Sequence, residues 1–396
     1  MLSVADAIQQ LTASASLRVG LEQIAIEHCL GRVLGADIVA PIDVPPADNS
    51  AMDGYTFCYQ DAVDKKFTLP LSQSIVAGHA PESLLKATVA RIFTGGEVPR
   101  GADTVAPQEH CYEQSGMVAL DKQIAKGDNV RPKGQDIPCG ARILSAGRVI
   151  RAQELGLLCS LGIQHLSLYE RLKVGFFSTG DELIQPGNKL QAGQIYDSNR
   201  ALISGLITSL GMIPIDLGAV PDNLNSTTEL LRQASQQADI ILTSGGVSVG
   251  GEDYLKQAVQ TLGKINFWKV AIKPGKPTVF GEVLGKPYIG LPGNPTSVFV
   301  TFIILVRPFL LKSQGCSQLN PRIHKSTALF SRCGERREVY LRARLIDQGV
   351  EIYTNQSSGV LSSACWGDAL VIQRPNLQIN QGDTVDVITF SSLGLS

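Results

Sequence analysis

Short apolar runs and amphipathic helical patterns alternate along residues 171–316. The apolar runs predict strands at residues 172–180, 213–220, 239–246, 264–272 and 286–293. The amphipathic patterns predict helices at residues 198–211, 226–238 and 252–263, and from Pro295 onwards. Alternation of strands and helices at this spacing predicts a parallel sheet with helices on both faces.

Polar residues mark where these helices are expected to begin. Ser198 and Ser226 stand at the start of two helical patterns and are typical N-caps. Asn294 is expected to cap the last helix, with Pro295 at its first position.

The rest of the chain differs from this central segment. Residues 54–135 and 321–396 contain short β-rich runs broken by turns, and the second stretch is typical of a small barrel or sandwich. We therefore expect a multidomain α/β protein. Its predicted parts are a mainly helical, elongated domain (1–45 and 140–170), an inserted β-rich domain (46–139), the α/β domain (171–316) and a C-terminal β-barrel domain (317–396).

Charge and composition exclude several classes of protein. The net charge is −1, from 35 basic and 36 acidic residues, so no general field favours nucleic acid or an anionic membrane. The apolar run from Val298 to Val306 is stopped by Arg307 and Pro308, which indicates a buried element rather than a membrane span. The eight cysteines form no C-x-x-C pair, which predicts reduced thiols in a cytoplasmic protein.

Four unusual loops follow predicted strands of the α/β domain. They read STGDE, SGGVSVGGED, IKPGKP and LPGNP. Ligands of open parallel sheets bind beyond the carboxyl ends of the strands. Four such loops at one edge predict a binding site, because turns needed only for folding would be found at both edges.

The glycine-rich loop fits neither the dinucleotide-binding nor the P-loop template. Its backbone N–H groups, with Ser244 and Ser248 near a helix start, suit an anion. Taken alone, the loop is better interpreted as a plain strand-to-helix turn, and the neighbouring loops favour a ligand.

Acidic residues gather on the same loops. Glu252 and Asp253 follow the glycines, Asp181 and Glu182 lie on a second loop, and Asp222 lies on a third. Each acid alone is typical of a helix start. Converging carboxylates are costly unless a cation offsets them, and their hard oxygens suit Mg²⁺.

Lysines supply the opposite charge. Lys269, Lys273 and Lys276 surround the KPGKP loop. Exposed lysines are usually only solvated, but two prolines fix this loop and lower the entropy lost on holding lysines at a ligand. The sequence therefore predicts an anion and a metal in one site.

Eight motifs in order resemble the molybdopterin molybdenumtransferase (MoeA) family, which includes the gephyrin E domain. They read NSAMDGY, TGGEVPRGAD, GQDI, STGDEL, YDSN, SGGVSVG, IKPGKP and LPGNP, and the resemblance covers nearly the whole chain. It implies an enzyme that inserts molybdenum from molybdate into adenylylated molybdopterin and releases AMP. It also implies L-shaped, four-domain subunits, and a homodimer whose site is shared between subunits.

The resemblance assigns roles to individual residues. The implied catalytic residues are Asp53, Asp136, Asp253, Lys269, Lys273 and Lys276. The implied substrate-binding residues are Thr94, Glu182, Asp222, Ser244, Gly245, Gly246, Ser248, Gly250, Pro292, Pro295, Arg337, Arg342 and Ser358. The implied metal ligands are Asp253, Glu182 and Asp222, with Mg²⁺ or a similar divalent cation as cofactor and molybdate as substrate.

One position departs from the family pattern. An acid usually follows SGGVSVG directly, but Gly251 stands there and Glu252 comes one residue later. Either Glu252 replaces that acid from a shifted position or the acid is dispensable.

Other functions remain open at this point. One is a molybdopterin adenylyltransferase, which is also an expected partner protein, and another is a non-enzymatic, gephyrin-like scaffold. A CinA-like nucleotide hydrolase is a third, since it shares the middle domain. A requirement for molybdate in AMP release distinguishes the insertion reaction from the first alternative.

Overall fold

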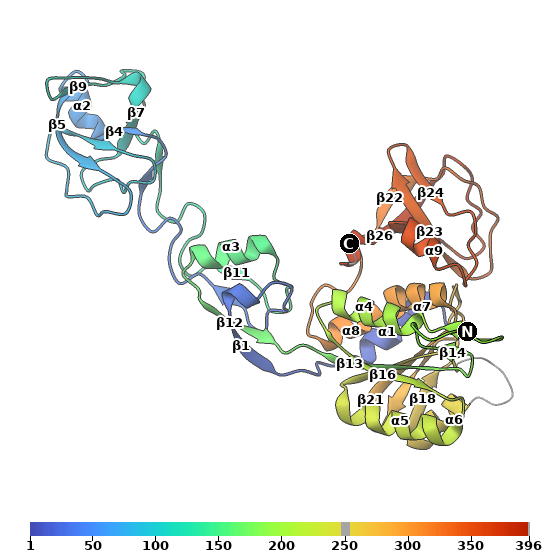
Figure 1. The fold of residues 1–396 in the computed structure, drawn as a ribbon. Helices are drawn as coiled ribbons and strands as arrows, with labels where there is room; N and C mark the ends of the chain where they lie inside the picture. The colour runs from blue at the N-terminus through green and yellow to red at the C-terminus, as the bar shows by residue number, and fades with distance from the viewer. Residues whose placement is uncertain (247–253, 395–396) are drawn as a thin grey trace. The chain divides into compact units, whose positions relative to one another are not determined.

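The computed structural model describes residues 1–246 and 254–394, and the chain in it divides into two compact units (Figure 1). The larger unit consists of Met1–Ala36, Ala146–Arg151 and Leu166–Ser396. The smaller unit consists of Asp37–Ser145 and Ala152–His165. Each unit has its own core and is described by itself.

A six-stranded sheet forms the centre of the larger unit, in the order β16-β13-β17-β21-β20-β18. Its strands are β13 (Lys173–Thr179), β16 (Ile213–Val220), β17 (Ile240–Ser244), β18 (Gly263–Phe267), β20 (Val279–Val283) and β21 (Lys286–Leu291). The first four strands in this order pair in parallel. The strands β20 and β18 pair antiparallel at the other edge.

Four strands therefore pair in parallel as predicted, and β18 runs in the same direction as they do. Only β20, which the apolar pattern did not predict, runs the opposite way. The reason is the turn between β20 and β21, where only Leu284 and Gly285 connect the strands. Both residues have positive φ, 49° and 79°, as a tight hairpin turn requires. Two residues cannot make the crossover that a parallel pair needs, so β20 must run antiparallel to β21.

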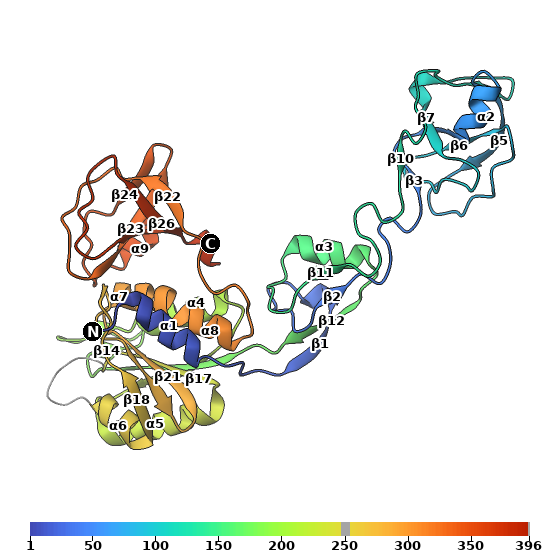
Figure 2. The ribbon, with the colours of Figure 1, turned by 180° about the vertical axis from the view of Figure 1, so that it is seen from behind.

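Helices cover both faces of this sheet (Figures 1 and 2). They are α1 (Val4–Ser14), α4 (Asn199–Ser209), α5 (Leu224–Gln237), α6 (Tyr254–Leu262), α7 (Pro295–Thr301) and α8 (Arg307–Ser313). Along β13, Phe176 packs into the core beneath α1, α4, α7 and α8, whereas Phe177 packs into the core beneath α5 and α6. The alternation follows from the two-residue period of a strand.

The capping bonds of two helices differ from the prediction. Ser198 occupies the N-cap position of α4, as predicted, but its side chain makes no capping bond within the described part of the chain. Instead, Asp197 Oδ1 accepts from the backbone N–H of Asn199 at 3.1 Å. The helix α5 is capped by Asn223, whose Oδ1 accepts from Ser226 N at 2.9 Å, so Ser226 is not its cap. Polar residues are common near helix starts, and the sequence alone does not fix which one reaches the free N–H groups.

The last helix continues further than the sequence indicates. A π-helical turn (Phe302–Val306) leads directly into α8, which begins at Arg307. Arg307 is buried, and its guanidinium donates to the carbonyls of Leu319 and Leu393. Arg307 and Pro308 therefore interrupt the apolar run without ending the helix, and the prediction of a buried element is confirmed.

By length and composition alone, the continuous helix Pro295–Ser313 would be apolar enough to cross a membrane. Within this fold, however, 89% of its most apolar window is buried, as in the core helix of a soluble domain.

Residues 1–45 and 140–170 are not mainly helical, contrary to the prediction. Beyond α1 and α3 (Ala152–Ser160) they form strand pairs, namely β1 (Leu21–Ala25) with β12 (His165–Tyr169) and β2 (Ile38–Val39) with β11 (Arg142–Leu144). The helix α1 packs through Val4, Ala7 and Leu11 into the core of the α/β sheet. Gly31, with φ 73°, turns the chain inside a stretch that reads as helical.

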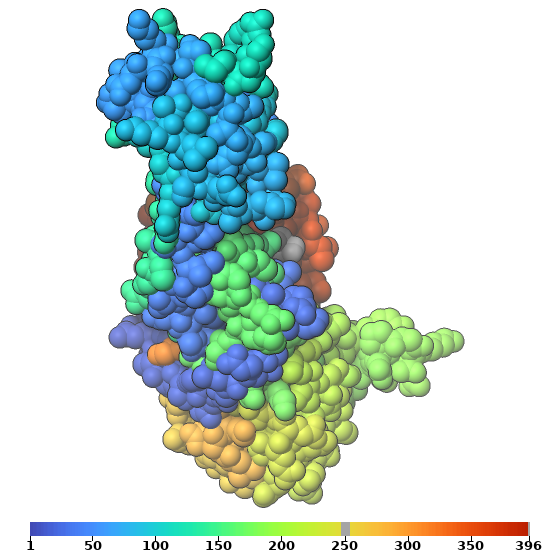
Figure 3. Space-filling model, turned by 90° about the vertical axis from the view of Figure 1, so that its left-hand side faces the viewer, coloured from blue at the N-terminus to red at the C-terminus, as the bar shows by residue number. Residues whose placement is uncertain are grey.

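A second sheet belongs to the smaller unit, in the order β7-β4-β6-β5-β9-β8. Its strands are β4 (Gly54–Phe57), β5 (Thr68–Ile75), β6 (Val89–Ile92), β7 (Thr104–Pro107), β8 (Tyr112–Gln114) and β9 (Met117–Ala119). The short helix α2 (Tyr59–Asp64) contributes Ala62 to the core of this sheet. Figure 3 shows this part of the chain as a compact body of blue to teal atoms.

The third sheet is C-terminal and runs β19-β23-β25-β26-β22, with β24 on β23. Its strands are β22 (His324–Thr327), β23 (Glu338–Ile346), β24 (Gly349–Ile352), β25 (Ala369–Gln373) and β26 (Thr384–Thr389). The remaining strand, β19 (Ile272–Lys273), comes from the α/β segment and pairs in parallel with β23. One strand of this sheet is thus contributed by the KPGKP loop.

Candidate functional site

The carboxyl ends of β13 and β17 lie at the point where the strand order reverses. The strand β13 pairs with β16 on one side and β17 on the other. Such a switch point is where open α/β sheets bind ligands. A cavity of about 1170 Å³ opens here, within the larger unit.

Many of the residues predicted for the site line this one cavity. They are Glu182, Asp222, Ser244, Gly245, Gly246, Lys273, Lys276, Pro292, Pro295, Arg337 and Ser358. They come from loops that follow different strands and from the C-terminal domain. Lys269 and Arg342 do not line it.

Other predicted residues lie elsewhere. Asp53, Thr94 and Asp136 belong to the smaller unit. Ser248, Gly250 and Asp253 lie outside the residues that the structure describes.

The glycine loop closes tightly against the end of β13. Gly245 and Gly246 have φ values of 85° and 62°. A Cβ atom on Gly245 would lie 2.4 Å from Thr179 O, and one on Gly246 would lie 2.7 Å from Thr179 Oγ1. Only glycine fits both positions, which brings backbone close to the cavity.

The KPGKP loop presents Lys273 beside a carboxylate that the sequence analysis missed. Lys273 Nζ lies 2.5 Å from Glu335 Oε2, and Arg332 donates to Glu335 Oε1 at 2.6 Å. Although partial burial acts in the opposite direction, these two cations lower the pKa of Glu335 below its usual value. Glu335 stands in the charged run GERRE, which reads as a solvated surface, so no local signal identifies it.

Basic side chains therefore gather on the KPGKP side of the cavity. Arg332 and Arg337 line it together with Lys273. Arg337 donates to the carbonyl of Ile272 at 3.0 Å, which ties it to β19. Lys276 is exposed at the same loop. Cations held by loop backbone and ion pairs suit an oxyanion.

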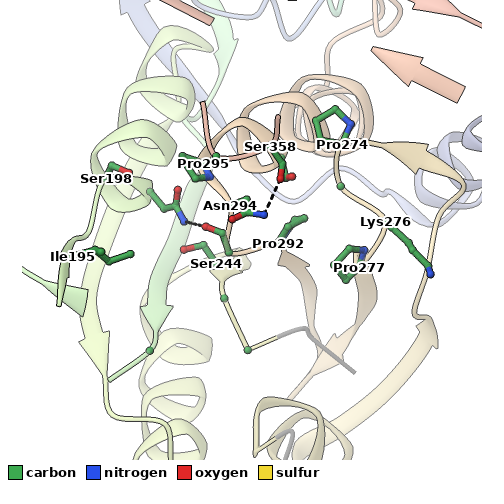
Figure 4. Close-up of a pocket in the computed structure, with 18 of the residues that line it drawn as sticks. Ile195, Ser198, Ser244, Pro274, Lys276, Pro277, Pro292, Asn294, Pro295 and Ser358 are labelled. Carbon is green, nitrogen blue, oxygen red and sulfur yellow. Dashed lines mark hydrogen bonds between the residues drawn. The ribbon is translucent and has the colours of Figure 1, made fainter. Parts of the chain in front are cut away.

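Asn294 joins the LPGNP loop to the C-terminal domain. Its Nδ2 donates to Ser358 Oγ at 2.8 Å, and Pro292 and Pro295 lie on either side of it along the loop (Figure 4). The backbone N–H of Thr296 donates to the carbonyl of Ser358 at 3.1 Å. These contacts hold Ser358 at the cavity.

Arg342 does not line the cavity, although the resemblance implies that it contacts the oxyanion. Its side chain is 1% exposed, and it donates to the carbonyl of Ser357 at 3.1 Å and to Ser363 Oγ at 3.0 Å. Burial, with Arg332 nearby, lowers its pKa to about 10. The prediction failed because alternation along β23 turns Arg342 inward, so that it supports the loop that carries Ser358.

Carboxylates lie on the loops after β13 and β16. Glu182 and Asp222 both line the cavity, and Asp222 N donates to Asp181 Oδ1 at 3.1 Å. Within the described ranges 1–246 and 254–394, no group of three or more His, Cys, Asp or Glu side chains is placed to hold a metal ion.

Two predicted residues contact each other in the smaller unit. Asp53 Oδ1 accepts from both the hydroxyl and the backbone N–H of Thr94, each at 2.7 Å. These two bonds lower the pKa of Asp53 below its usual value. Asp136 lies exposed in a turn, where its N–H donates to the carbonyl of Val44.

Three family models match almost the whole chain. They are described as the MoeA N-terminal region (domain I and II), over residues 2–162, a probable molybdopterin binding domain, over 175–312, and the MoeA C-terminal region (domain IV), over 331–390.

Curated and solved relatives agree with these models. The chain is 39% identical to the molybdopterin molybdenumtransferase of Haemophilus influenzae over 82% of this chain and 81% of that protein. It is 35% identical to the enzyme of that name from a Nostoc species, over 86% and 82%. A solved MoeA protein from Pyrococcus horikoshii is 30% identical, with a TM-score of 0.84 over 98% of this chain and 99% of that one.

The motifs at the switch point, the domain models along the chain and these full-length relatives all lead to one assignment. The chain belongs to the molybdopterin molybdenumtransferase (MoeA) family.

Proposed function

We propose that this protein inserts molybdenum, delivered as molybdate, into adenylylated molybdopterin and releases AMP. One observation carries the proposal: a single cavity has a cationic side, with Lys273, Arg332 and Arg337, and carboxylates at Glu182 and Asp222. Molybdate is a tetrahedral dianion, which suits the cationic side. The membership of the family supports the same reaction.

Each residue that lines the cavity would bind or orient the part of the substrate that lies next to it. Lys273 and Arg337 would bind and orient the oxyanion, and Ser358, held by Asn294, would present a hydroxyl beside it. The backbone of Gly245 and Gly246 would pack against the substrate near the switch point. Correct positioning of anionic reactants is the main contribution of such sites to rate.

A divalent cation fits the donors on the acidic side. Mg²⁺ usually binds through one or two carboxylates plus substrate phosphates, and Glu182 and Asp222 supply hard oxygens in one cavity. Asp253 is the third ligand that the sequence suggests. When bound, Mg²⁺ would neutralise charge on the phosphates of the substrate.

The proposed assembly is a homodimer in the cytoplasm. The family resemblance suggests that Asp53 and Thr94 of one subunit complete the site of the other. All eight cysteines are free thiols, in keeping with a reducing compartment. The enzyme that adenylylates molybdopterin is the proposed partner, because it makes the substrate.

AMP release tests the reaction. We expect AMP from adenylylated molybdopterin only when molybdate and Mg²⁺ are both present, measured by separating the nucleotides. Equal AMP release without molybdate would indicate simple hydrolysis. Formation of molybdopterin and ATP on addition of pyrophosphate would identify an adenylyltransferase instead.

Replacement of Glu335 tests the cationic side directly. We expect Glu335→Gln to bind molybdate about fivefold to tenfold more tightly, because Lys273 and Arg332 lose the anion that neutralises them. Isothermal titration with molybdate measures this change. Weaker binding would show instead that Glu335 serves to hold Lys273 in position. Glu282→Gln, which removes the surface partner of Lys264, is the matched control and should leave the affinity unchanged.

The same ion pair predicts a pH dependence. The pKa of Glu335 is depressed in the folded protein, so the ionised carboxylate stabilises the fold fully above its unfolded pKa. This stabilisation is lost as pH falls through the folded pKa, because Glu335 then becomes neutral, like the glutamine of the variant. The difference in molybdate affinity between wild type and Glu335→Gln should therefore shrink at acidic pH.

A further inference from the structure

Three residues that line the same cavity each carry a buried polar atom that has no hydrogen-bond partner among residues 1–246 and 254–394. These atoms are Thr179 Oγ1, Asp197 Oδ2 and Asn199 Oδ1. The three residues are only 4%, 4% and 7% exposed. Buried polar atoms almost always have a hydrogen-bond partner, and three without one at a single cavity indicate a polar ligand.

The roles of two of these atoms are fixed by their neighbours. Asp197 Oδ1 already accepts from the N–H groups of Asn199 and Arg200, at 3.1 and 3.3 Å. Asn199 Nδ2 donates to the carbonyl of Gly293 at 2.7 Å, which leaves its Oδ1 as an acceptor. Asp197 Oδ2 and Asn199 Oδ1 are therefore two acceptors near the start of α4 that make no bond within the described residues, and a ligand that binds both must bring donors.

These acceptors lie on the α4 side of the cavity. Figure 4 shows Ile195 and Ser198, their neighbours in the chain, across the cavity from Pro274 and Pro277 of the KPGKP loop. Acceptors at one side and cations at the other suit a long ligand with an N–H-bearing end and an anionic end.

The chemistry of the acceptors distinguishes between heterocycles. A 2-aminopyrimidin-4-one ring carries an amine and a ring N–H side by side, which are two adjacent donors. Adenine carries its amine beside ring nitrogens that only accept, so a pair of acceptors fits it poorly. Thr179 can donate as well as accept, and can therefore satisfy a ring carbonyl.

We propose that Thr179, Asp197 and Asn199 form a subsite that binds the aminopyrimidinone edge of the pterin ring. The inference rests on the proposed function, because it takes the substrate to be a molybdopterin. Asp197 and Asn199 accept from the amine and the ring N–H, and Thr179 lies at the ring carbonyl. The subsite orients the pterin so that its anionic end faces the basic residues.

Asp197→Asn tests this subsite without removing the helix cap. Asparagine caps a helix as well as aspartate does, so its oxygen can replace Oδ1. Its amide nitrogen then replaces the free acceptor Oδ2 with a donor. The probes are pterin and lumazine, in which a carbonyl replaces the amine, and fluorescence titration measures their affinities.

We expect wild type to bind pterin about tenfold more tightly than lumazine, because lumazine leaves a buried acceptor unpaired. Asp197→Asn should lose or reverse this preference. Asp216→Asn is the matched control: it removes the partner of Arg200 on the same helix, does not line the cavity, and should keep the preference.

Equal binding of both probes by wild type would overturn the subsite and indicate that water alone fills these positions. Retention of the preference in Asp197→Asn would also overturn it. The AMP assay separates this result from the proposed reaction. Molybdate-dependent AMP release without pterin preference would reject only the subsite, and pterin preference without that release would reject only the reaction.

Discussion

Mixing subunits that carry Asp53→Asn with subunits that carry Asp253→Asn is expected to restore about a quarter of wild-type activity. Each variant alone should be nearly inactive, because a carboxylate is removed from every site. In the proposed homodimer, Asp53 of one subunit acts with Asp253 of the other. Half of the randomly exchanged dimers are mixed, and each mixed dimer has one site with both substitutions and one with neither.

The matched control uses two residues of the same unit. Asp53 and Thr94 are hydrogen-bonded to each other, so subunits with Asp53→Asn and subunits with Thr94→Ala should not complement one another. Differently tagged chains would verify exchange. No recovery from the Asp53 and Asp253 pair, with exchange verified, would place both acids in a site within one chain.

Gly275→Ala should disable the KPGKP loop. Gly275 has φ 114°, and a Cβ atom there would lie 2.1 Å from Thr301 Cγ2. Backbone strain and overpacking each cost about 1–3 kcal/mol, so the variant should lose roughly 2–6 kcal/mol of unfolding free energy. The loop carries Lys273, so molybdate affinity should fall more than tenfold. Denaturant unfolding and titration measure the two effects.

A second substitution separates the two causes. Thr301→Ser removes the methyl group that the new Cβ would meet but keeps the hydroxyl that donates to Ser297 O at 2.6 Å. The double variant should recover the cost of the clash and keep the cost of the φ angle. If Gly275→Ala alone retained wild-type stability and affinity, the close packing of this loop would have no role in anion binding.

The sequence predicted the elements whose signal is local. The strands β13, β17 and β21 are continuous apolar runs, and Pro295 begins its helix as expected. The strand β20 was missed, because Gly281 interrupts it and its place is decided by pairing with β21 rather than by its own pattern. Strand direction followed from the short hairpin turn, which the apolar pattern does not reveal.

The site was predictable to the extent that it depends on strand ends. Glu182, Ser244 and Pro292 lie at one edge because parallel strands place their carboxyl ends together. Side-chain direction was not predictable, as Arg342 shows by pointing into the C-terminal domain. The sequence did not identify Glu335, because its partner Lys273 lies far away along the chain. It did not identify Asp197, because the role of Asp197 is inferred from a buried oxygen that has no hydrogen-bond partner among the described residues.

The pairing of β19 with β23 has a consequence for synthesis on the ribosome. The carbonyl of Ile272 accepts a hydrogen bond from Arg337, which lies 65 residues further along the chain. The strand β19, which contains Lys273, therefore has no partner strand until β23 has emerged from the ribosome. At about 5–20 residues per second, this is an interval of roughly 3–13 seconds. The strands of the α/β sheet, which end at Leu291, are all available by then. A nascent or prematurely terminated chain would thus present the proposed pterin subsite before the proposed oxyanion side is complete, and competence for metal insertion would require the domain formed by residues 317–396.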